Sequence, residues 1–410
     1  MKPTTPLYEQ QPFARQFTGR IAAVDPTRPN APRVALDETL FYPEGGGQPC
    51  DDGLLWLEGC ADPFAVVDVH RQGDVIWHAL STLGASRPLT ELLREGGAVR
   101  GEINWHRRFD HMQQHTGEHI LSGTLHRLFG TENVGFHIGA EVIRMDLDKP
   151  LEWEDLKIAE LRANEVVWAN VLVQATVYPG EAAVDKPYRS KKELDGPVRI
   201  VEIPGGDCCA CCGTHLERSG QVGMIKILTA EHYKGGTRLT AACGGRALAA
   251  AEAMRSRQQR IGALLSAQPE ATFTAVQRLY EEKTAVDYRY YGLCQQLSEL
   301  LAAQAAQTPE QPVLVSLPRL EPAWLARMAT RLAAAVPGTV CAVISEHTQA
   351  TFYCLASGTQ DVRPLTKQLN AALGGKGGGK PNSCQGSCPA VGAAQVEATL
   401  RTLLAEGPVG

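Results

Sequence analysis

Two segments that lie far apart in the chain each carry a pair of side chains able to bind a metal ion. The first, His115-Thr-Gly-Glu-His119, places two imidazoles four positions apart, and the second, Cys211-Cys-Gly-Thr-His215, places a thiol and an imidazole at the same spacing. Residues four positions apart on a helix share one face, so such a pair can reach a common ion. Three imidazoles and one thiolate are a ligand set that suits zinc. The sequence therefore predicts one zinc site built from both segments.

The same stretches contain rivals for two of these four positions. His111 precedes His115 at the same four-residue spacing and could take the place of His119. The residue pattern alone leaves this alternative open. Three further cysteines compete for the thiolate position: Cys208, Cys209 and Cys212.

Two other kinds of zinc site share part of this pattern. Four protein ligands that fill a tetrahedron form a closed, structural site, and this is a serious rival to a catalytic one. The spacing of His115, Glu118 and His119 also fits the inverted His-x-x-Glu-His motif of some zinc peptidases, with Glu118 as general base. The Cys–His pair argues against a peptidase, because it would leave no open position on the zinc ion.

A third segment, Tyr42-Pro-Glu-Gly-Gly-Gly-Gln48, contains three consecutive glycines. Glycines let the backbone approach a ligand closely and expose its N–H groups. Glu44 and Gln48 add polar side chains at the two ends of the glycine run. A plain turn of a β-barrel would explain the same glycines.

The elements that must position these residues fall into four parts. Residues 1–104 read as short alternating strands separated by Gly and Pro, which favours a small β-barrel. Residues 105–246 mix strands and helices, with a helix over 111–128 that we expect Asp110 to cap. We expect a second helix over 152–170 and classify this part as α+β.

Alanine, leucine, glutamine and charged residues dominate 247–310, where two helical runs flank Pro269 and predict a helical hairpin arm. Residues 311–410 show a β-α-β-β-α pattern, a glycine-rich loop and a last helix near 393–405, typical of a small α/β domain. The predicted fold is thus an α+β multidomain chain. An exposed helical arm also favours a homodimer.

The bulk composition is that of a globular protein, with 44% hydrophobic and 21% charged residues and a net charge of −5. Any nucleic-acid binding must therefore rest on local basic groups such as Lys376 and Lys380. No apolar run reaches the length of a membrane span, and the first residues lack the apolar segment of a signal peptide. We expect a cytoplasmic protein without membrane association.

Taken in order, the segments at 42–48, 115–119 and 211–215 resemble the motifs of the AlaX proteins, free-standing relatives of the alanyl-tRNA synthetase editing domain. Lys234-Gly-Gly-Thr-Arg238 with Cys243-Gly-Gly-Arg246 resembles the closing segment of that family. Leu373-Gly-Gly-Lys-Gly-Gly-Gly-Lys380 resembles the glycine-rich loop of the C-terminal domain of alanyl-tRNA synthetase. The resemblance covers nearly the whole chain, as in the long AlaX subclass.

The resemblance implies roles for particular residues. It makes the zinc ligands His115, His119, Cys211 and His215, and so decides against His111. It places Gln48 and His137 at the catalytic centre of a zinc-binding editing domain. It implies tRNA binding by the terminal glycine-rich segment, which comprises Gly375, Lys376, Gly377, Gly378, Gly379 and Lys380.

The activity implied is hydrolysis of the ester that joins a wrong amino acid, chiefly serine, to the tRNA for alanine. A synthetase pocket shaped for alanine rejects a residue that adds only a hydroxyl by about 100-fold, so a second site is needed. A site that hydrogen-bonds the hydroxyl can discriminate by about four or five orders of magnitude. The alternative function is a non-catalytic tRNA- or RNA-binding protein with a structural zinc site.

Overall fold

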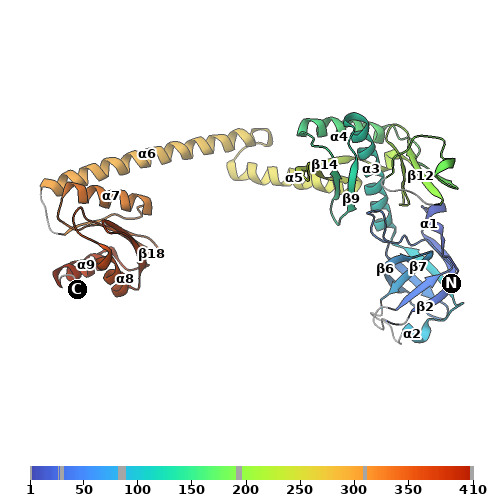
Figure 1. Ribbon diagram of the computed structural model, residues 1–410, viewed down its shortest axis with the longest axis horizontal. Helices are drawn as coiled ribbons and strands as arrows, with labels where there is room; N and C mark the ends of the chain where they lie inside the picture. Colours follow the sequence, from blue (N-terminus) through green and yellow to red (C-terminus); the bar gives the residue numbers. More distant parts are fainter. Residues whose placement is uncertain are drawn as a thin grey trace. The chain divides into compact units, whose positions relative to one another are not determined.

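The computed structural model describes residues 2–25, 27, 32–81, 89–190, 196–307 and 312–406. It contains several sheets and helices in separate compact parts, so the prediction of an α+β multidomain chain is confirmed at that level (Figure 1). The chain divides into two compact units, residues 1–260 and 261–410, and each is described by itself. The finer division into four parts stays a proposal.

The first unit begins with six strands that close into a barrel. Along each strand buried apolar residues alternate with exposed ones, as in β2, where Phe17, Ile21 and Ala23 face the barrel core. Gly101 lies opposite Phe17 in the neighbouring strand, and a Cβ there would sit 2.1 Å from the Phe17 ring. In barrel order the strands are β2 (Gln16–Asp25), β3 (Arg33–Leu36), β7 (Val75–Leu80), β6 (Phe64–Gln72), β5 (Gly53–Leu57) and β8 (Ala98–Ile103).

Short elements accompany the barrel. Strand β1 (Thr5–Pro6) pairs in parallel with β4 (Glu38–Thr39), and the single-turn helices are α1 (Leu7–Gln10) and α2 (Leu89–Leu92). The chain from β4 to β5 contains the triple glycine. Its Gln48 side chain contacts the helix that follows the barrel, where Oε1 lies 2.8 Å from His115 Nδ1.

That helix, α3, covers Trp105–Phe129 and carries the first pair of predicted ligands. It begins earlier than predicted, because Asn104 rather than Asp110 caps it and accepts a hydrogen bond from the Arg107 amide at 3.3 Å. The carboxylate of Asp110 instead binds the Arg246 guanidinium, 2.9 Å away. Gly130 ends the helix in the left-handed conformation, with φ of 63°.

A buried ion pair fastens α3 to the barrel. The Arg108 guanidinium is fully buried and binds the Asp51 carboxylate, with Nε 3.0 Å from Oδ2. Arg108 also donates to the Leu40 carbonyl at 2.6 Å, and Asp51 accepts from the Tyr42 amide at 2.8 Å. These contacts fix the glycine-containing loop beside the helix.

Two sheets complete the first unit. A four-stranded antiparallel sheet has the order β14-β15-β10-β9, from β14 (Ile225–Tyr233), β15 (Gly236–Cys243), β10 (Ile143–Leu147) and β9 (Asn133–Ile138). A three-stranded sheet joins β11 (Gln174–Tyr178), β12 (Val198–Ile203) and β13 (Asp207–Ala210). Helix α3 packs with α4 (Trp153–Trp168), and the short helices are η1 (Glu181–Ala183) and η2 (Ser219–Val222).

Both helices predicted around Pro269 are present. Helix α5 spans Gly244–Leu265 and includes the division between the two units, whereas α6 spans Thr272–Gln307 in the second unit. Pro269 lies in a short 3-10 turn between them, η3 (Pro269–Ala271). Residues 308–311, the end of the predicted arm, fall outside the described part of the chain.

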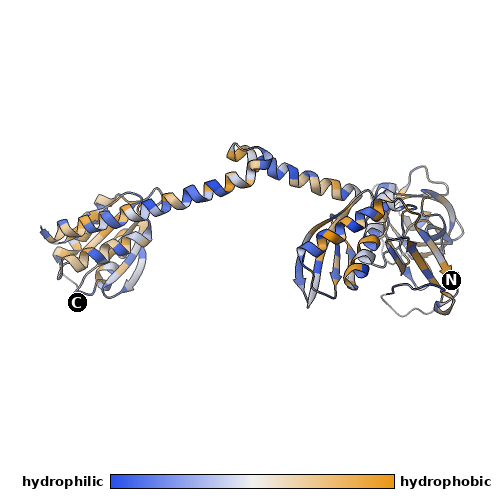
Figure 2. Cartoon of the chain, turned by 90° about the horizontal axis from the view of Figure 1, so that it is seen from above, coloured by the Kyte–Doolittle hydropathy of each residue, from blue (hydrophilic) through white to orange (hydrophobic). Residues whose placement is uncertain are grey.

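The second unit ends in a five-stranded sheet covered by helices. The sheet order is β16-β17-β18-β20-β19, from β16 (Val313–Ser316), β17 (Cys341–Glu346), β18 (Ala350–Ala356), β20 (Ser383–Pro389) and β19 (Lys376–Lys380). The helices are α7 (Pro322–Ala335), α8 (Arg363–Leu373) and α9 (Ala393–Glu406), and apolar residues of α6 and α7 share one core (Figure 2).

The glycine-rich segment predicted as a loop is an edge strand, β19, so that part of the prediction is wrong. Because its glycines have no Cβ, β20 can approach β19 very closely. A Cβ on Gly377 would lie 2.2 Å from the Gln385 carbonyl oxygen, and one on Gly379 would lie 2.4 Å from that of Ser383.

In the residues that the structure describes, no helix combines the length and apolar character needed to cross a membrane.

Candidate metal centre

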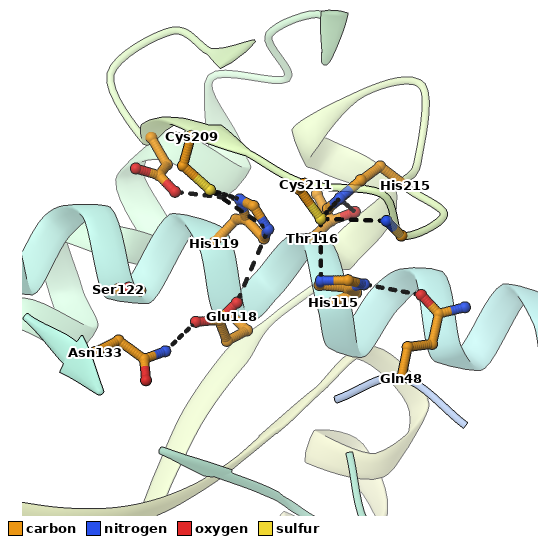
Figure 3. A network of polar contacts seen from close by, with 12 residues as sticks. Gln48, His115, Thr116, Glu118, His119, Ser122, Asn133, Cys209, Cys211 and His215 are labelled. Carbon is orange, nitrogen blue, oxygen red and sulfur yellow. Dashed lines mark hydrogen bonds and ion pairs between the residues drawn. The ribbon is translucent and has the colours of Figure 1, made fainter. Parts of the chain in front are cut away.

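Four predicted ligands come together between α3 and the segment that follows β13. The side chains of His115, His119, Cys211 and His215 each offer a donor atom, and these atoms all lie within 4.8 Å of one another (Figure 3). The sulfur of Cys211 lies 3.5 Å from His115 Nε2 and 3.3 Å from His215 Nε2. The two distant sequence segments therefore converge on one point.

Glycines allow this close approach. Gly213 lies against the His115 ring, and a Cβ there would be 2.1 Å from the ring carbon Cε1. On the other side of the helix, a Cβ on Gly117 would be 2.3 Å from the sulfur of Cys243 in β15. The glycines inside both motifs thus serve packing, the first against the ligand and the second against the sheet.

Each of the three imidazoles has a hydrogen-bond partner on its Nδ1 atom. Gln48 Oε1 lies 2.8 Å from Nδ1 of His115, and Asp207 Oδ2 lies 3.1 Å from that of His119. Thr116 Oγ1 lies 3.3 Å from Nδ1 of His215. With Nδ1 as the donor, each ring keeps Nε2 unprotonated for a metal ion.

Burial and the neighbouring polar groups together set the pKa values in the centre. Burial raises the pKa of the Cys211 thiol, but the surrounding imidazoles outweigh burial and hold this pKa well below its ordinary value. Burial lowers the pKa of His215 to about 3, which keeps that ring neutral. Burial also raises the pKa of Asp207, but hydrogen bonds from His119 and Arg189 hold it below its ordinary value. A thiolate and a neutral imidazole are the forms that bind metals.

The donor set and its spacing fit zinc. Zinc–nitrogen and zinc–sulfur bonds of about 2.0–2.3 Å in a tetrahedron place the ligand atoms about 3.3–3.8 Å apart. The distances of 3.3 and 3.5 Å from Cys211 to two of the imidazoles fall in this range. The four residues therefore have the donor types and the proximity to hold one zinc ion.

The alternative ligands considered from the sequence lie in less favourable positions for binding the same ion. Cys209 forms a second possible group with His119 and Asp207, but its sulfur contacts His119 alone among the three imidazoles, at 3.4 Å from Nδ1. That nitrogen already faces Asp207. Cys212 is exposed, and His111 is absent from both groups of possible ligands found among the described residues.

A cavity of about 330 Å³ opens beside the four side chains. Polar and apolar groups both form its wall, and the Phe136 ring lies 5.4 Å from that of His115. Among the other residues that form this wall are Gly46, Glu118, Ser122, Asn133, Arg189 and Arg199. A volume of this size admits a small polar group such as an aminoacyl ester.

The two residues predicted at the catalytic centre do not line this cavity. Gln48 is fully buried behind His115, where its Nε2 atom donates to Thr214 Oγ1 at 2.8 Å, so it positions the imidazole instead of contacting a ligand. His137 is exposed and follows Phe136 in β9. Successive residues of a strand point to opposite faces, and Phe136 faces the cavity, so His137 points away from it.

The predicted tRNA-binding residues belong to the second unit. Lys376, Gly377, Gly378, Gly379 and Lys380 are all exposed along β19, and Gly375 precedes the strand. Lys376 borders a shallow pocket of about 260 Å³.

Sequence reasoning missed several residues that surround the metal centre: Thr116, Asn133, Arg189 and Asp207. Thr116 lies within the His115–His119 segment, but nothing in the sequence indicates that its hydroxyl meets His215, and no motif marks the other three, because only the fold brings them to the histidines.

Comparisons with known proteins agree with this geometry. Residues 198–245, which include the Cys211 segment, match the family described as "Threonyl and Alanyl tRNA synthetase second additional domain". Residues 14–107 match "tRNA synthetases class II (A)". The solved C-Ala domain of Aquifex aeolicus alanyl-tRNA synthetase matches 24% of this chain and 90% of its own length, at 18% identity and a TM-score of 0.22.

Three relatives illustrate the similarity. The chain is 28% identical to "Alanyl-tRNA editing protein Aarsd1" from Danio rerio over 90% of this chain and 87% of that protein. It is 32% identical to "Alanyl-tRNA editing protein AlaX-L" from Pyrococcus horikoshii over 59% and 58% of the two chains. It is 34% identical to "Alanine--tRNA ligase" from Pyrococcus furiosus over 75% of this chain and 33% of that enzyme.

The chain spans only 33–42% of the length of the first alanine–tRNA ligases that it matches. By contrast, the Danio rerio editing protein matches along most of both chains. These similarities and the arrangement of the motifs agree with each other, and the chain fits the AlaX family of alanyl-tRNA editing proteins.

Proposed function

We propose that this protein is a zinc-dependent hydrolase that deacylates mischarged tRNA for alanine, chiefly when the tRNA carries serine. The observation that carries the proposal is the convergence of three imidazoles and one thiolate, of which His115, His119 and Cys211 form part of the wall of a cavity of about 330 Å³. The names of two relatives, both alanyl-tRNA editing proteins, support the same substrate.

His115, His119, Cys211 and His215 would hold the ion. Bound zinc can polarise a carbonyl oxygen or lower the pKa of a water molecule. The residues around the ligands keep them in place: Gln48, Thr116 and Asp207 each hold one imidazole through its Nδ1 atom. A fixed set of ligands needs no reorganisation during the reaction, which favours catalysis.

The test is hydrolysis of seryl-tRNA and alanyl-tRNA, both on the tRNA for alanine. We expect rapid loss of the seryl ester, slow loss of the alanyl ester, and no hydrolysis after zinc is removed from a protein that stays folded. Equal loss of both esters would reject the selectivity. Loss of neither by the zinc-bound protein would favour the alternative, a tRNA-binding protein with structural zinc, for which chelation should unfold the domain.

We further propose that β19 contacts tRNA. Lys376 and Lys380 are exposed on an edge strand whose glycines leave the backbone open to a phosphate. Replacement of both lysines by glutamate should weaken tRNA binding and reduce its dependence on salt. Because this unit is separate from the metal centre, zinc content should not change; unchanged binding at every salt concentration would contradict the proposal.

A homodimer through the helical arm is also proposed. Four aliphatic residues recur every seven positions on α6 and are between 53% and 69% exposed: Leu279, Val286, Leu293 and Leu300. One apolar residue per heptad supplies one of the two apolar positions of a coiled-coil seam. Val286→Lys with Leu293→Lys should convert a dimer to a monomer in sedimentation experiments. A parent protein that sediments as a monomer would refute the dimer.

A further inference from the structure

One carboxylate in the cavity wall has no role in the metal centre described above. Glu118 lies on α3 immediately before His119 and is only 3% exposed. It faces the cavity beside the four candidate ligands (Figure 3). A buried carboxylate without a strong partner is costly, so its surroundings should show what it is placed to bind.

Among the residues that the structure describes, side chains hydrogen-bond only one of its two oxygens. Oε1 accepts a hydrogen bond from Asn133 Nδ2, and the Asn133 side-chain oxygen in turn accepts from the Gly135 amide at 3.1 Å, which fixes the orientation of the amide. Oε2 lies 4.0 Å from His119 Nε2, too far for a hydrogen bond. No side chain that the structure describes donates a hydrogen bond to Oε2.

The other charged groups in the cavity wall are already engaged. Both carboxylate oxygens of Asp207 contact His119 or Arg189. The Arg199 guanidinium donates to the Cys211 and Gly213 carbonyls at 2.7 and 3.1 Å. Glu118 therefore presents an open acceptor next to the metal centre, in a cavity sized for an aminoacyl group.

We propose that Glu118 Oε2 accepts a hydrogen bond from the side-chain hydroxyl of the aminoacyl group and so determines the preference for serine. This inference rests on the proposed function. A carboxylate is an acceptor only, and a seryl group offers it a hydroxyl donor that an alanyl or glycyl group lacks. A substrate without that hydroxyl offers Oε2 no such donor, and a site that hydrogen-bonds a hydroxyl rejects an analogue that lacks it.

The proposal separates two roles that a carboxylate here could have. A carboxylate that binds the α-ammonium group would serve every aminoacyl ester equally, whereas one that binds the hydroxyl serves serine alone. The Glu118→Met variant removes the acceptor at similar volume. Glu132→Met is a matched control, because Glu132 also borders the cavity but is half exposed and already pairs with His126.

The experiment compares hydrolysis of seryl-tRNA and glycyl-tRNA, both on the tRNA for alanine, by the zinc-loaded parent and the two variants. Loss of a hydrogen bond to a charged group should slow seryl hydrolysis by about 10- to 100-fold in Glu118→Met. Glycyl hydrolysis and the zinc content should remain as in the parent, and Glu132→Met should keep the parent ratio of the two rates.

Binding gives a second readout that does not depend on catalysis. The seryl and glycyl amides of 3′-amino-3′-deoxyadenosine contain no ester that could be hydrolysed. In calorimetry, Glu118→Met should bind the seryl amide more weakly than the parent does, and it should bind the glycyl amide with the affinity of the parent. Equal losses with both amides, unchanged affinity for both, or a variant that has lost zinc would each overturn the proposal. Failure of the proposed function would look different, because the parent protein would then leave both esters intact.

Discussion

Replacement of Gln48 by leucine tests whether the metal centre depends on residues behind its ligands. Gln48 Oε1 accepts from His115 Nδ1 at 2.8 Å and from the Thr214 amide at 3.2 Å. Leucine has similar size but would leave both buried donors without an acceptor. Each unsatisfied group costs about 1–3 kcal/mol, so the free energy of unfolding of the first unit should fall by about 2–6 kcal/mol.

The same substitution should weaken zinc binding by about 10- to 100-fold, the usual effect of losing the partner that orients a metal-binding histidine. Affinity is measured by competition with a chromophoric chelator, and folding by circular dichroism. Gln48→Glu is the matched control, because a carboxylate keeps the acceptor for His115 while the Thr214 hydroxyl can turn to donate. A folded Gln48→Leu protein that binds zinc as tightly as the parent would refute this reasoning.

Three further perturbations have expected outcomes. Thr116→Val removes the oxygen near His215 Nδ1 and the acceptor of the Leu216 amide, so it should lower the unfolding free energy by about 1–3 kcal/mol and weaken zinc binding in a chelator competition. Arg108→Met leaves the Asp51 carboxylate buried without its partner and should cost about 3–5 kcal/mol in urea unfolding. Burial lowers the pKa of His78 to about 4 from its ordinary 6.5. Between pH 6.5 and pH 4, His78 is therefore protonated in the unfolded chain and neutral in the folded chain. Unfolding free energy should therefore fall by up to about 3 kcal/mol from pH 6.5 to pH 4, and His78→Gln should show a smaller fall in urea titrations at each pH.

The predicted elements were most accurate where the apolar pattern was strongest. The helices around Pro269 lie within a few residues of their predicted positions, and the β-α-β-β-α pattern predicted after them is present as β16, α7, β17, β18 and α8, whereas β20 was not predicted. The start of α3 was misplaced because Asn104 and Asp110 are both suitable capping residues, and only the buried contact between Arg108 and the barrel reveals that the first turn is helical. The glycine-rich segment reads as a loop because glycine weakens a strand, and only the structure shows the close approach of β20 that glycine permits here.

The candidate site, like the fold, could be predicted from the sequence only in part. Motif spacing suggested which side chains could meet, and the structure places those side chains within 4.8 Å. The family resemblance implies Gln48 and His137 at the catalytic centre, but motifs carry no information about depth, and the structure places the Gln48 side chain behind His115. Motifs also do not report which face of β9 carries His137. The partners Asp207 and Asn133 come from other elements, and their proximity depends on the tertiary fold.

The central claim is that His115, His119, Cys211 and His215 hold one zinc ion. X-ray absorption at the zinc edge of the purified full-length protein tests it most directly. The expected result is one zinc ion per chain, with three nitrogen ligands at about 2.0–2.1 Å and one sulfur ligand at about 2.3 Å. A spectrum with no sulfur or with two sulfurs, or a protein that binds no zinc, would contradict it.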